Sequence, residues 1–378
     1  MDLSAKRSLT QVSPTWHLPQ IMGALELALN GSGDALRFAE KDNPNLSIVP
    51  GEIALVVATS GSTGSAKEVC FSANALFASA RASADYLGAT SQDRWSLLLP
   101  LTHIAGVNVL VRSLIFNQAP VDLRDTFDKD LDGIGFTAIV AAQLHRAIFG
   151  KLEDDRKLLK HLQSVKKVLI GGGPLDLALK SKAEAKSISL VETYGSTETS
   201  GGCLYDGVPL NGVEVKIVDN QLFLKGDTLA SYYAVSNSGT DISTESFTDN
   251  DGWYQSSDFG FWEENRVKVL GRVDDIIISG GKKISLSLIE SIYREAEPDI
   301  DFAVFSISDP KWGEKLVIAA DKDLSLVKRA EIESEITQLY GGYAVPKEFQ
   351  KVDRIPRTSL GKLDRSSIIA MREKKKNF

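Results

Sequence analysis

The sequence contains few cysteines, which limits the kinds of protein it can encode. Only Cys70 and Cys203 occur among its 378 residues. Two cysteines cannot build the disulfide framework that small secreted domains commonly need, so a reducing cytoplasm is the expected location.

Long apolar runs and an excess of positive charge are also missing. The most apolar region, residues 97–116, is interrupted by His103 and Arg112 and falls short of the ~20 residues of a membrane-spanning helix. The first eleven residues lack the apolar core of a signal peptide. A net charge of -7 gives no attractive field for nucleic acid. We therefore expect neither a membrane span nor a nucleic-acid partner, while a homo-oligomer stays open.

The length and the spacing of apolar residues predict two domains. A chain of 378 residues exceeds the ~250–300 residues over which one hydrophobic core usually extends. In the first part, short apolar runs alternate with segments of helical spacing, which predicts parallel βαβ units with helices on both faces of the sheet. The expected strands are 53–59, 95–99, 138–142, 168–170 and 188–191, and the expected helices include 74–87, 104–116 and 176–186.

The pattern changes after Gly201. Residues 213–218, 221–225, 259–262 and 266–270 predict short strands of a small β-rich subdomain. From Ser285 onward we expect a small, mobile α+β domain with strands at 302–307 and 316–320 and a helix at 326–339, and with Ser287 and Glu290 as a capping box for a helix to Arg294. The predicted boundary lies at Asp274, between domains 1–273 and 274–378.

A loop rich in glycine and hydroxyl groups follows the strand 53–59 directly. It contains Thr59, Ser60, Gly61, Ser62, Thr63, Gly64 and Lys67. Glycines let backbone N–H groups approach an anion closely, hydroxyls add donors, and a lysine adds a point charge for phosphate. The glycine spacing differs from that of a Walker loop. A flexible surface turn is the alternative, and the preceding strand and the following lysine favour phosphate.

This loop resembles the phosphate-binding signature of the adenylate-forming superfamily, which includes acyl-CoA synthetases. Five further segments similar to motifs of that superfamily follow in order: 194–198 (YGSTE), 256–258 (SSD), 271–275 (GRVDD), 309–314 (DPKWGE) and 356–365 (PRTSLGKLDR). Ala66 and Ser257 depart from the usual proline and glycine, so altered loop mobility is expected there. Motifs in this order make the resemblance specific over residues 53–365.

The resemblance implies an ATP-dependent, AMP-forming acid–thiol ligase that uses ATP, Mg²⁺ and coenzyme A. The glycine-rich loop and Lys67 would hold the phosphates, Thr197 the α-phosphate, and Glu198 the metal. The ribose would contact Asp258 and Arg272. Other expected nucleotide-binding residues are Gly172, Gly173, Tyr194, Gly195 and Ser196.

The resemblance also implies two alternating positions of the C-terminal domain. Lys362 would be the catalytic lysine that bridges the acid and the α-phosphate. Asp274 would be the hinge about which the domain then rotates. After rotation, Gly280 would line the pantetheine tunnel and Lys282 would meet a phosphate of coenzyme A, although a solvated surface lysine is the alternative for Lys282.

The segment 100–106 (PLTHIAG) with His103 resembles that of o-succinylbenzoate–CoA ligases of menaquinone synthesis, and the chain as a whole resembles their short form. This implies 2-succinylbenzoate as the small carboxylic acid, with His103 at the acid. Arg112, Ser200 and Tyr205 are candidates for its second carboxylate. The alternatives are another aryl or short-chain acid, a carrier-protein thiol as acceptor, or an inactive nucleotide-binding module.

Overall fold

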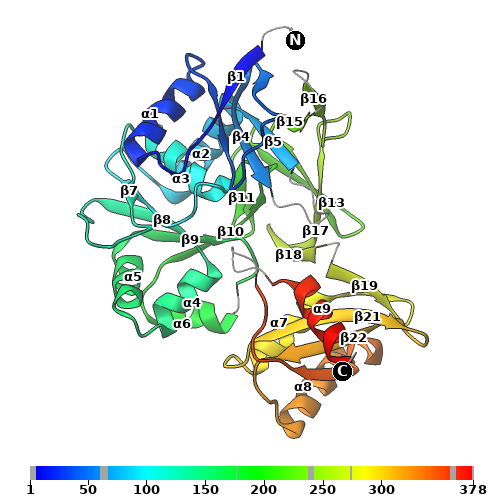
Figure 1. The fold of residues 1–378 in the computed structure, drawn as a ribbon. Coiled ribbons are helices and arrows are strands. Elements are labelled where there is room, and N and C mark those ends of the chain that lie inside the picture. Colours follow the sequence, from blue (N-terminus) through cyan, green and yellow to red (C-terminus); the bar gives the residue numbers. More distant parts are fainter. Residues whose placement is uncertain are drawn as a thin grey trace.

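The computed structural model describes residues 6–59, 67–175, 177–236, 242–272, 275–357 and 363–376. These residues form three sheets in a large N-terminal part and a fourth sheet in a C-terminal unit (Figure 1). Mixed α and β structure in two parts confirms the expected fold class. The helices of the described part include none that is long and apolar enough to cross a membrane.

The first sheet is mixed and carries both ends of the glycine-rich loop. In spatial order its strands are β16 (Ile242–Glu245), β15 (Tyr232–Ser236), β5 (Lys67–Ser72), β4 (Ile53–Thr59), β2 (Ala35–Phe38), β1 (Lys6–Gln11) and β3 (Ile48–Pro50). Strand β4 runs parallel to β2 but antiparallel to β5. The loop therefore joins two antiparallel neighbours. Helices α1 (Leu18–Leu29) and α2 (Ala73–Leu87) bury apolar side chains in the same core as this sheet.

The second sheet contains the expected parallel strands. Its order is β12 (Val208–Pro209), β11 (Gly201–Tyr205), β10 (Leu190–Ser196), β9 (Lys167–Gly171), β8 (Ile134–Val140), β6 (Arg94–Leu97) and β7 (Val121–Asp122). Strands β7, β6, β8, β9 and β10 are parallel, and β11 turns back antiparallel to β10.

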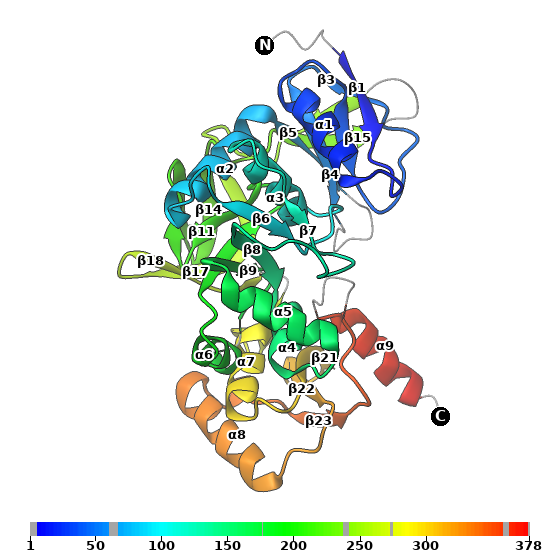
Figure 2. The same cartoon turned by 90° about the vertical axis from the view of Figure 1, so that its left-hand side faces the viewer.

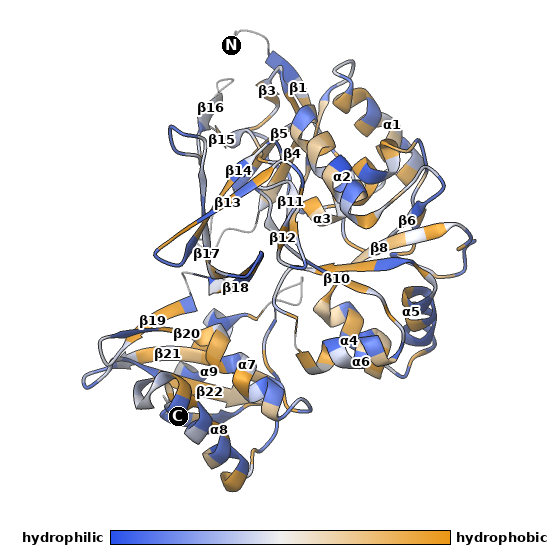
Figure 3. Cartoon of the chain, turned by 180° about the vertical axis from the view of Figure 1, so that it is seen from behind, coloured by the Kyte–Doolittle hydropathy of each residue, from blue (hydrophilic) through white to orange (hydrophobic). Residues whose placement is uncertain are grey.

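Helices cover the second sheet on both faces, as the sequence predicts. On one face α2 and α3 (Ile104–Leu114) share a core with the first sheet, whereas α4 (Ala141–Phe149), α5 (Glu153–Ser164) and α6 (Leu177–Ala185) cover the other face. Strand β8 is largely hydrophobic and α5 largely hydrophilic in Figure 3. This contrast is expected for a strand that is buried on both sides and a helix that exposes one side to water.

The predicted β-rich segment forms a four-stranded antiparallel sheet. Its strands are β13 (Val213–Val218), β14 (Gln221–Gly226), β17 (Tyr254–Glu263) and β18 (Arg266–Arg272). The bounds of β13 agree with the prediction, whereas β17 begins five residues earlier than expected and so includes Asp258. Among the described strands, β13 and β18 are the two edges of this sheet, so it does not close into a barrel.

The C-terminal unit has its own hydrophobic core and lies beside α4 and α6 (Figure 2). Its sheet comprises β19 (Ile276–Ser279), β20 (Lys282–Ser285), β21 (Phe302–Asp309), β22 (Gly313–Ala320) and β23 (Glu348–Lys351). Helices α7 (Leu286–Ala296), α8 (Leu326–Tyr340) and α9 (Arg365–Lys376) complete it, with a short 3-10 turn at Gly342–Ala344.

One predicted helix start and one predicted strand end are wrong. The N-cap of α7 is Ser285, whose hydroxyl accepts a hydrogen bond from the Leu288 amide at 3.3 Å; Ser287 instead donates to Asp275, so it forms no capping box with Glu290. The expected strand 138–142 ends at Val140, because the Gln143 side chain accepts the Val140 amide proton at 3.1 Å and begins α4 there. In both cases a side chain one or two positions away offers the hydrogen bond.

Candidate active site

Pairing of β4 with β5 brings the two ends of the glycine-rich loop together. Thr59 and Lys67 are the last paired residues, and the Thr59 hydroxyl donates to the Lys67 carbonyl at 3.4 Å. The residues between them, including Ser60, Gly61, Ser62, Thr63 and Gly64, lie outside the described part of the chain. Next to Lys67, the buried Glu68 carboxylate accepts two hydrogen bonds from Arg37, at 3.0 and 2.6 Å. This buried pair fixes the strand that presents Lys67.

The segment Tyr194–Glu198 lies at the carboxyl end of β10, where parallel sheets commonly bind ligands. A Cβ atom on Gly195 would lie 1.9 Å from the carbonyl oxygen of Gly201, so only glycine allows β10 and β11 to approach here. Thr197 and Glu198 occupy the turn between these strands. The buried Thr199 hydroxyl stabilises this turn with two hydrogen bonds. It accepts one from the Ser196 amide at 2.9 Å and donates one to the Gly201 carbonyl at 2.7 Å.

Tyr233 joins this turn to the glycine-rich loop. Its hydroxyl donates to Oε1 of Glu198 at 2.7 Å, and the Lys67 ammonium lies 4.4 Å from the centre of its ring. The structure therefore brings together Lys67 and Glu198, which are 131 positions apart in the sequence. Tyr233 is a site residue that the sequence analysis missed, because a tyrosine in a short β-rich segment has no distinguishing pattern of its own.

Asp258 and Arg272, the expected ribose contacts, stand directly opposite each other on β17 and β18. The Tyr194 hydroxyl donates to Oδ2 of Asp258 at 2.8 Å, which links this sheet to β10. Burial, followed by the charge of Asp258, raises the pKa of Tyr194, so its hydroxyl stays protonated and able to donate. A carboxylate and a guanidinium at paired strand positions can accept from and donate to ribose hydroxyls.

Gly172 and Gly173 are exposed at the carboxyl end of β9, the strand beside β10. Gly172 has a φ of 83°, a left-handed backbone conformation that favours glycine. The turn therefore lies on the same sheet edge as the Tyr194–Glu198 segment, beside the other expected nucleotide-binding residues.

The segment with His103 forms a sharp turn into α3. His103 is the residue before the helix, and a Cβ atom on Gly106 would lie 2.2 Å from the Pro100 carbonyl oxygen. The glycine of this motif is therefore needed for close backbone packing. His103 is partly exposed, and it lies on the same sheet edge as β10 because β6 and β10 are parallel.

Arg112, farther along α3, is a buried cation in an unusual environment. Its side chain is 4% exposed, it donates to the Tyr205 hydroxyl at 3.0 Å, and its guanidinium lies 4.9 Å from the centre of the Trp95 ring. No acidic side chain of the described residues forms an ion pair with it, and its Nε lacks a hydrogen-bond partner there. A buried cation without a carboxylate is costly unless a ligand supplies the negative charge.

Ser200 lies in a second buried polar group next to α3. Asn108 donates to the Ser200 carbonyl at 2.7 Å, while Oδ1 of Asn108 and the Ser200 hydroxyl lack partners among the described residues. The Tyr205 hydroxyl, which accepts from Arg112, also forms a hydrogen bond with the Ser83 hydroxyl at 2.8 Å. Of the three candidates for the second carboxylate, Arg112 alone carries a positive charge.

The residues assigned to the second half-reaction lie within the C-terminal unit. Gly280 begins the turn between β19 and β20, where its nearest side chains are Trp312 and Tyr343, and Lys282 is exposed just after it. The structure does not bring these two into contact with Glu198 or Asp258. Asp274 and Lys362 lie outside the described residues.

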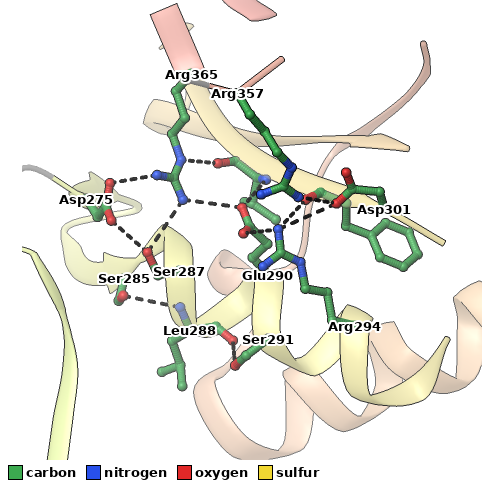
Figure 4. Close-up of polar contacts among 12 residues, drawn as sticks. Asp275, Ser285, Ser287, Leu288, Glu290, Ser291, Arg294, Asp301, Arg357 and Arg365 are labelled. Carbon is green, nitrogen blue, oxygen red and sulfur yellow. Dashed lines mark hydrogen bonds and ion pairs between the residues drawn. The ribbon is translucent and has the colours of Figure 1, made fainter. Parts of the chain in front are cut away.

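Arginines on either side of residues 358–362 are held by acidic side chains (Figure 4). Arg357 donates to Asp301 at 2.6 Å. Arg365 binds Asp275 at 2.9 Å and Glu290 at 3.3 Å, and it also donates to the Val304 carbonyl at 2.7 Å. Asp275 directly follows the expected hinge residue, so Arg365 connects the chain after Lys362 to the chain after Asp274.

Comparison with known proteins gives the family. The AMP-binding enzyme family matches residues 6–228, and the AMP-binding enzyme C-terminal domain matches residues 288–362. A protein of Mycobacterium tuberculosis described as a probable 2-succinylbenzoate–CoA ligase is 33% identical over 373 residues, which cover 92% of this chain and 94% of that protein.

Solved structures agree in fold. The o-succinylbenzoate CoA synthetase (MenE) of Bacillus subtilis in complex with the acyl-adenylate intermediate OSB-AMP superimposes with a TM-score of 0.68 at 24% identity, over 92% of this chain and 80% of that one. The same protein in complex with ATP and magnesium ion gives 0.68 at 23% identity, over 92% and 82%. The two matched family models and the relative aligned over most of both chains show that this chain belongs to the family of AMP-binding enzymes.

Proposed function

We propose that this chain is a 2-succinylbenzoate–CoA ligase of menaquinone synthesis. It would convert ATP, 2-succinylbenzoate and coenzyme A into 2-succinylbenzoyl-CoA, AMP and diphosphate. The alignment of nearly the whole chain with the M. tuberculosis relative, at 33% identity, carries this proposal. Family membership alone supports the coarser statement that the protein is an ATP-dependent, AMP-forming ligase.

In the first half-reaction, a carboxylate oxygen attacks the α-phosphorus of ATP, and the bond from that phosphorus to the β-phosphate oxygen breaks. Two anions must approach, so fixed positive charge and hydrogen-bond donors should dominate. Lys67 supplies one charge at the end of the glycine-rich loop, and Thr197 lies in the turn after β10. Lys362 would supply the charge that bridges the two reactants.

Mg²⁺ enters with ATP as part of the substrate. The described residues contain no group of three or more acidic, histidine or cysteine side chains that could hold a metal. They do offer the Glu198 carboxylate, oriented by Tyr233. A single carboxylate fits Mg²⁺, which usually binds one or two carboxylates together with substrate phosphates and water.

Arg112 is the residue that we assign to the aromatic carboxylate of 2-succinylbenzoate. Its buried guanidinium has no acidic partner within the described part of the chain, and its Nε is unpaired there. A planar guanidinium suits a carboxylate because both can form two parallel hydrogen bonds. The acid's other carboxylate would then point toward the α-phosphate, with His103 at the start of the same helix.

In the second half-reaction, the thiol of coenzyme A loses its proton, its sulfur attacks the acyl carbon, and the bond to AMP breaks. We place the domain boundary at Asp274, between 1–273 and 274–378, and assign Gly280 and Lys282 to the pantetheine and a phosphate of coenzyme A. Gly280 lies in the turn between β19 and β20, and Lys282 is the first residue of β20, so the two are close in the C-terminal unit, which supports a shared role after rotation. Two unpaired, buried cysteines support a location in the cytoplasm.

The test is to measure AMP release and the mass of the CoA product with ATP, Mg²⁺, coenzyme A and a panel of acids. A CoA adduct formed much faster from 2-succinylbenzoate than from benzoate or acetate is the expected result. AMP release with a different acid would support the adenylation chemistry but reject 2-succinylbenzoate as the substrate. Product formed on a carrier protein but not on coenzyme A would reject coenzyme A as the acceptor.

A further inference from the structure

Pairing between strands places Tyr233 between the two phosphate-handling segments. Strand β15 pairs antiparallel with β5, and Tyr233 stands opposite Val69. Lys67 is two residues before Val69, so it projects from the same face of β5 and is a diagonal neighbour of Tyr233. The distance of 4.4 Å from the ammonium to the ring centre agrees with this register.

The side chain of Tyr233 is held in one place. It is 8% exposed, and its ring packs against Phe247 with 5.2 Å between the ring centres. A phenol is protonated at neutral pH, so the hydroxyl can donate. Its one proton is directed at Oε1 of Glu198, at 2.7 Å.

The Glu198 backbone is fixed in the same region. The Glu198 carbonyl accepts the Ala230 amide proton at 2.8 Å, three residues before Tyr233. No other hydrogen bond to the Glu198 carboxylate occurs among the described residues. The chain from Ala230 to Tyr233 therefore sets both the position of the turn and the orientation of its carboxylate.

We infer that Tyr233 is a positioning residue that holds the Glu198 carboxylate and the Lys67 ammonium in a fixed relative position. Glu198 then receives the metal, and Lys67 the phosphates, of a single metal–nucleotide complex. The inference rests on the metal-binding role proposed for Glu198. Its physical basis is that a carboxylate already oriented by a hydrogen bond loses less freedom when it binds a metal.

The neighbouring residue offers a matched control. Tyr232 lies on the opposite face of β15, and its hydroxyl donates to the Glu52 carboxylate at 3.0 Å. Tyr232→Phe and Tyr233→Phe therefore remove the same kind of hydrogen bond from adjacent positions. Both keep the ring, and with it the contact between Tyr233 and Lys67.

The experiment measures binding without turnover. Mn²⁺ would be titrated into the full chain with a non-hydrolysable ATP analogue, and bound metal followed by electron paramagnetic resonance; affinity for the analogue would be measured separately without metal. Tyr233→Phe should weaken Mn²⁺ binding about tenfold, at the lower end of the effect of losing a residue that orients a metal ligand. Tyr233→Phe should change the affinity for the analogue without metal by less than about twofold. Tyr232→Phe should change neither affinity by more than about twofold.

Two further variants separate the possible failures. Tyr233→Leu should also weaken metal-free analogue binding, because Lys67 loses its ring contact. Glu198→Gln should weaken Mn²⁺ binding at least as much as Tyr233→Phe. An unchanged Mn²⁺ affinity in Glu198→Gln would reject the metal role of Glu198 itself. A normal affinity in Tyr233→Phe beside a weakened one in Glu198→Gln would reject the positioning role alone.

Discussion

The hydroxyl of Tyr194 lies 2.8 Å from Oδ2 of Asp258 and donates a hydrogen bond to it. The two residues belong to different sheets, Tyr194 to β10 and Asp258 to β17. The contact links one carboxylate oxygen of the expected ribose site to the parallel sheet. The expected nucleotide site therefore draws its residues from two different sheets.

Replacing Asp258 with alanine should weaken ATP binding. Loss of charge-assisted hydrogen bonds to the ribose predicts about 1.5–3 kcal/mol, or roughly 10- to 150-fold in Kd. Titration calorimetry with ATP measures the change. Asp251→Ala, at an exposed turn just before the same strand, is the control and should bind normally. An unchanged Kd in Asp258→Ala would reject its contact with the ribose.

Lys362→Ala should lose formation of the acyl-adenylate while it keeps the second half-reaction. Removal of one fixed donor to developing charge costs roughly 10²–10³ in rate. Diphosphate release measures the first half, and conversion of a supplied acyl-adenylate to the thioester measures the second. Equal loss of both half-reactions would contradict the assignment, because the lysine should leave the site when the C-terminal domain rotates.

Arg112→Lys should impair recognition of the diacid. Lysine keeps the charge but loses the planar pair of donors, which predicts about a 10- to 100-fold rise in KM for 2-succinylbenzoate. The KM for 4-oxo-4-phenylbutanoate, which lacks the aromatic carboxylate, should stay within about twofold. Arg81→Lys, an exposed arginine on the neighbouring helix α2, is the control. A parallel rise for both acids would indicate a packing defect.

The unfolding free energy should fall in mild acid because of His161. This side chain is 2% exposed, its Nε2 shares a hydrogen bond with Ser96 at 2.8 Å, and its Nδ1 has no partner among the described residues. Burial lowers its pKa from 6.5 to about 4. Between these values the unfolded chain binds a proton that the folded chain does not, so stability decreases as pH falls, by about 3 kcal/mol over the window.

Chemical denaturation at pH 7.5 and at pH 5.0 measures this loss. His161→Gln keeps a polar group near Ser96 but cannot titrate, so its loss of stability over the same interval should be smaller by about 1.5–2 kcal/mol. Parallel pH profiles for the two proteins would show that other groups dominate the acid sensitivity.

Arg365→Ala should destabilise the C-terminal unit. The substitution leaves the Glu290 carboxylate, which is 5% exposed, with Arg294 as its remaining cation, and it also frees Asp275. Breaking a fully buried pair costs about 3–5 kcal/mol, and partial exposure of Arg365 reduces this to about 1–3 kcal/mol. Hydrogen exchange of amides in α7 and β21 measures the change.

The control for Arg365 is Arg329→Ala, which removes a half-exposed pair with Glu333 on α8 and should cost less than about 0.5 kcal/mol. Equal protection of α7 and β21 in the two variants would show that Arg365 adds no more than an ordinary surface pair.

The sequence was sufficient for the two-part fold, and it named the residues of the candidate site except Tyr233. Short apolar runs alternating with segments of helical spacing predicted parallel strands covered by helices. This works because the apolar residues that a strand or a helix buries recur with the period of that element. The glycines at 106 and 195 lie where a Cβ atom would overlap a backbone carbonyl, so their motifs reflect contacts that allow no other residue. Local patterns failed at the end of β8 and at the start of α7, because the hydrogen bond that begins the helix at each point could come from several neighbouring side chains.

Only the tertiary structure decided which distant side chains meet. The register of β15 against β5 places Tyr233 beside Lys67, and the turn after β10 places Glu198 beside the same tyrosine. The absence of an acidic partner for Arg112 among the described residues is equally a property of packing around α3. Sequence patterns report the periods of single elements, whereas contacts between elements depend on strand register and on how the sheets pack, which no local pattern encodes.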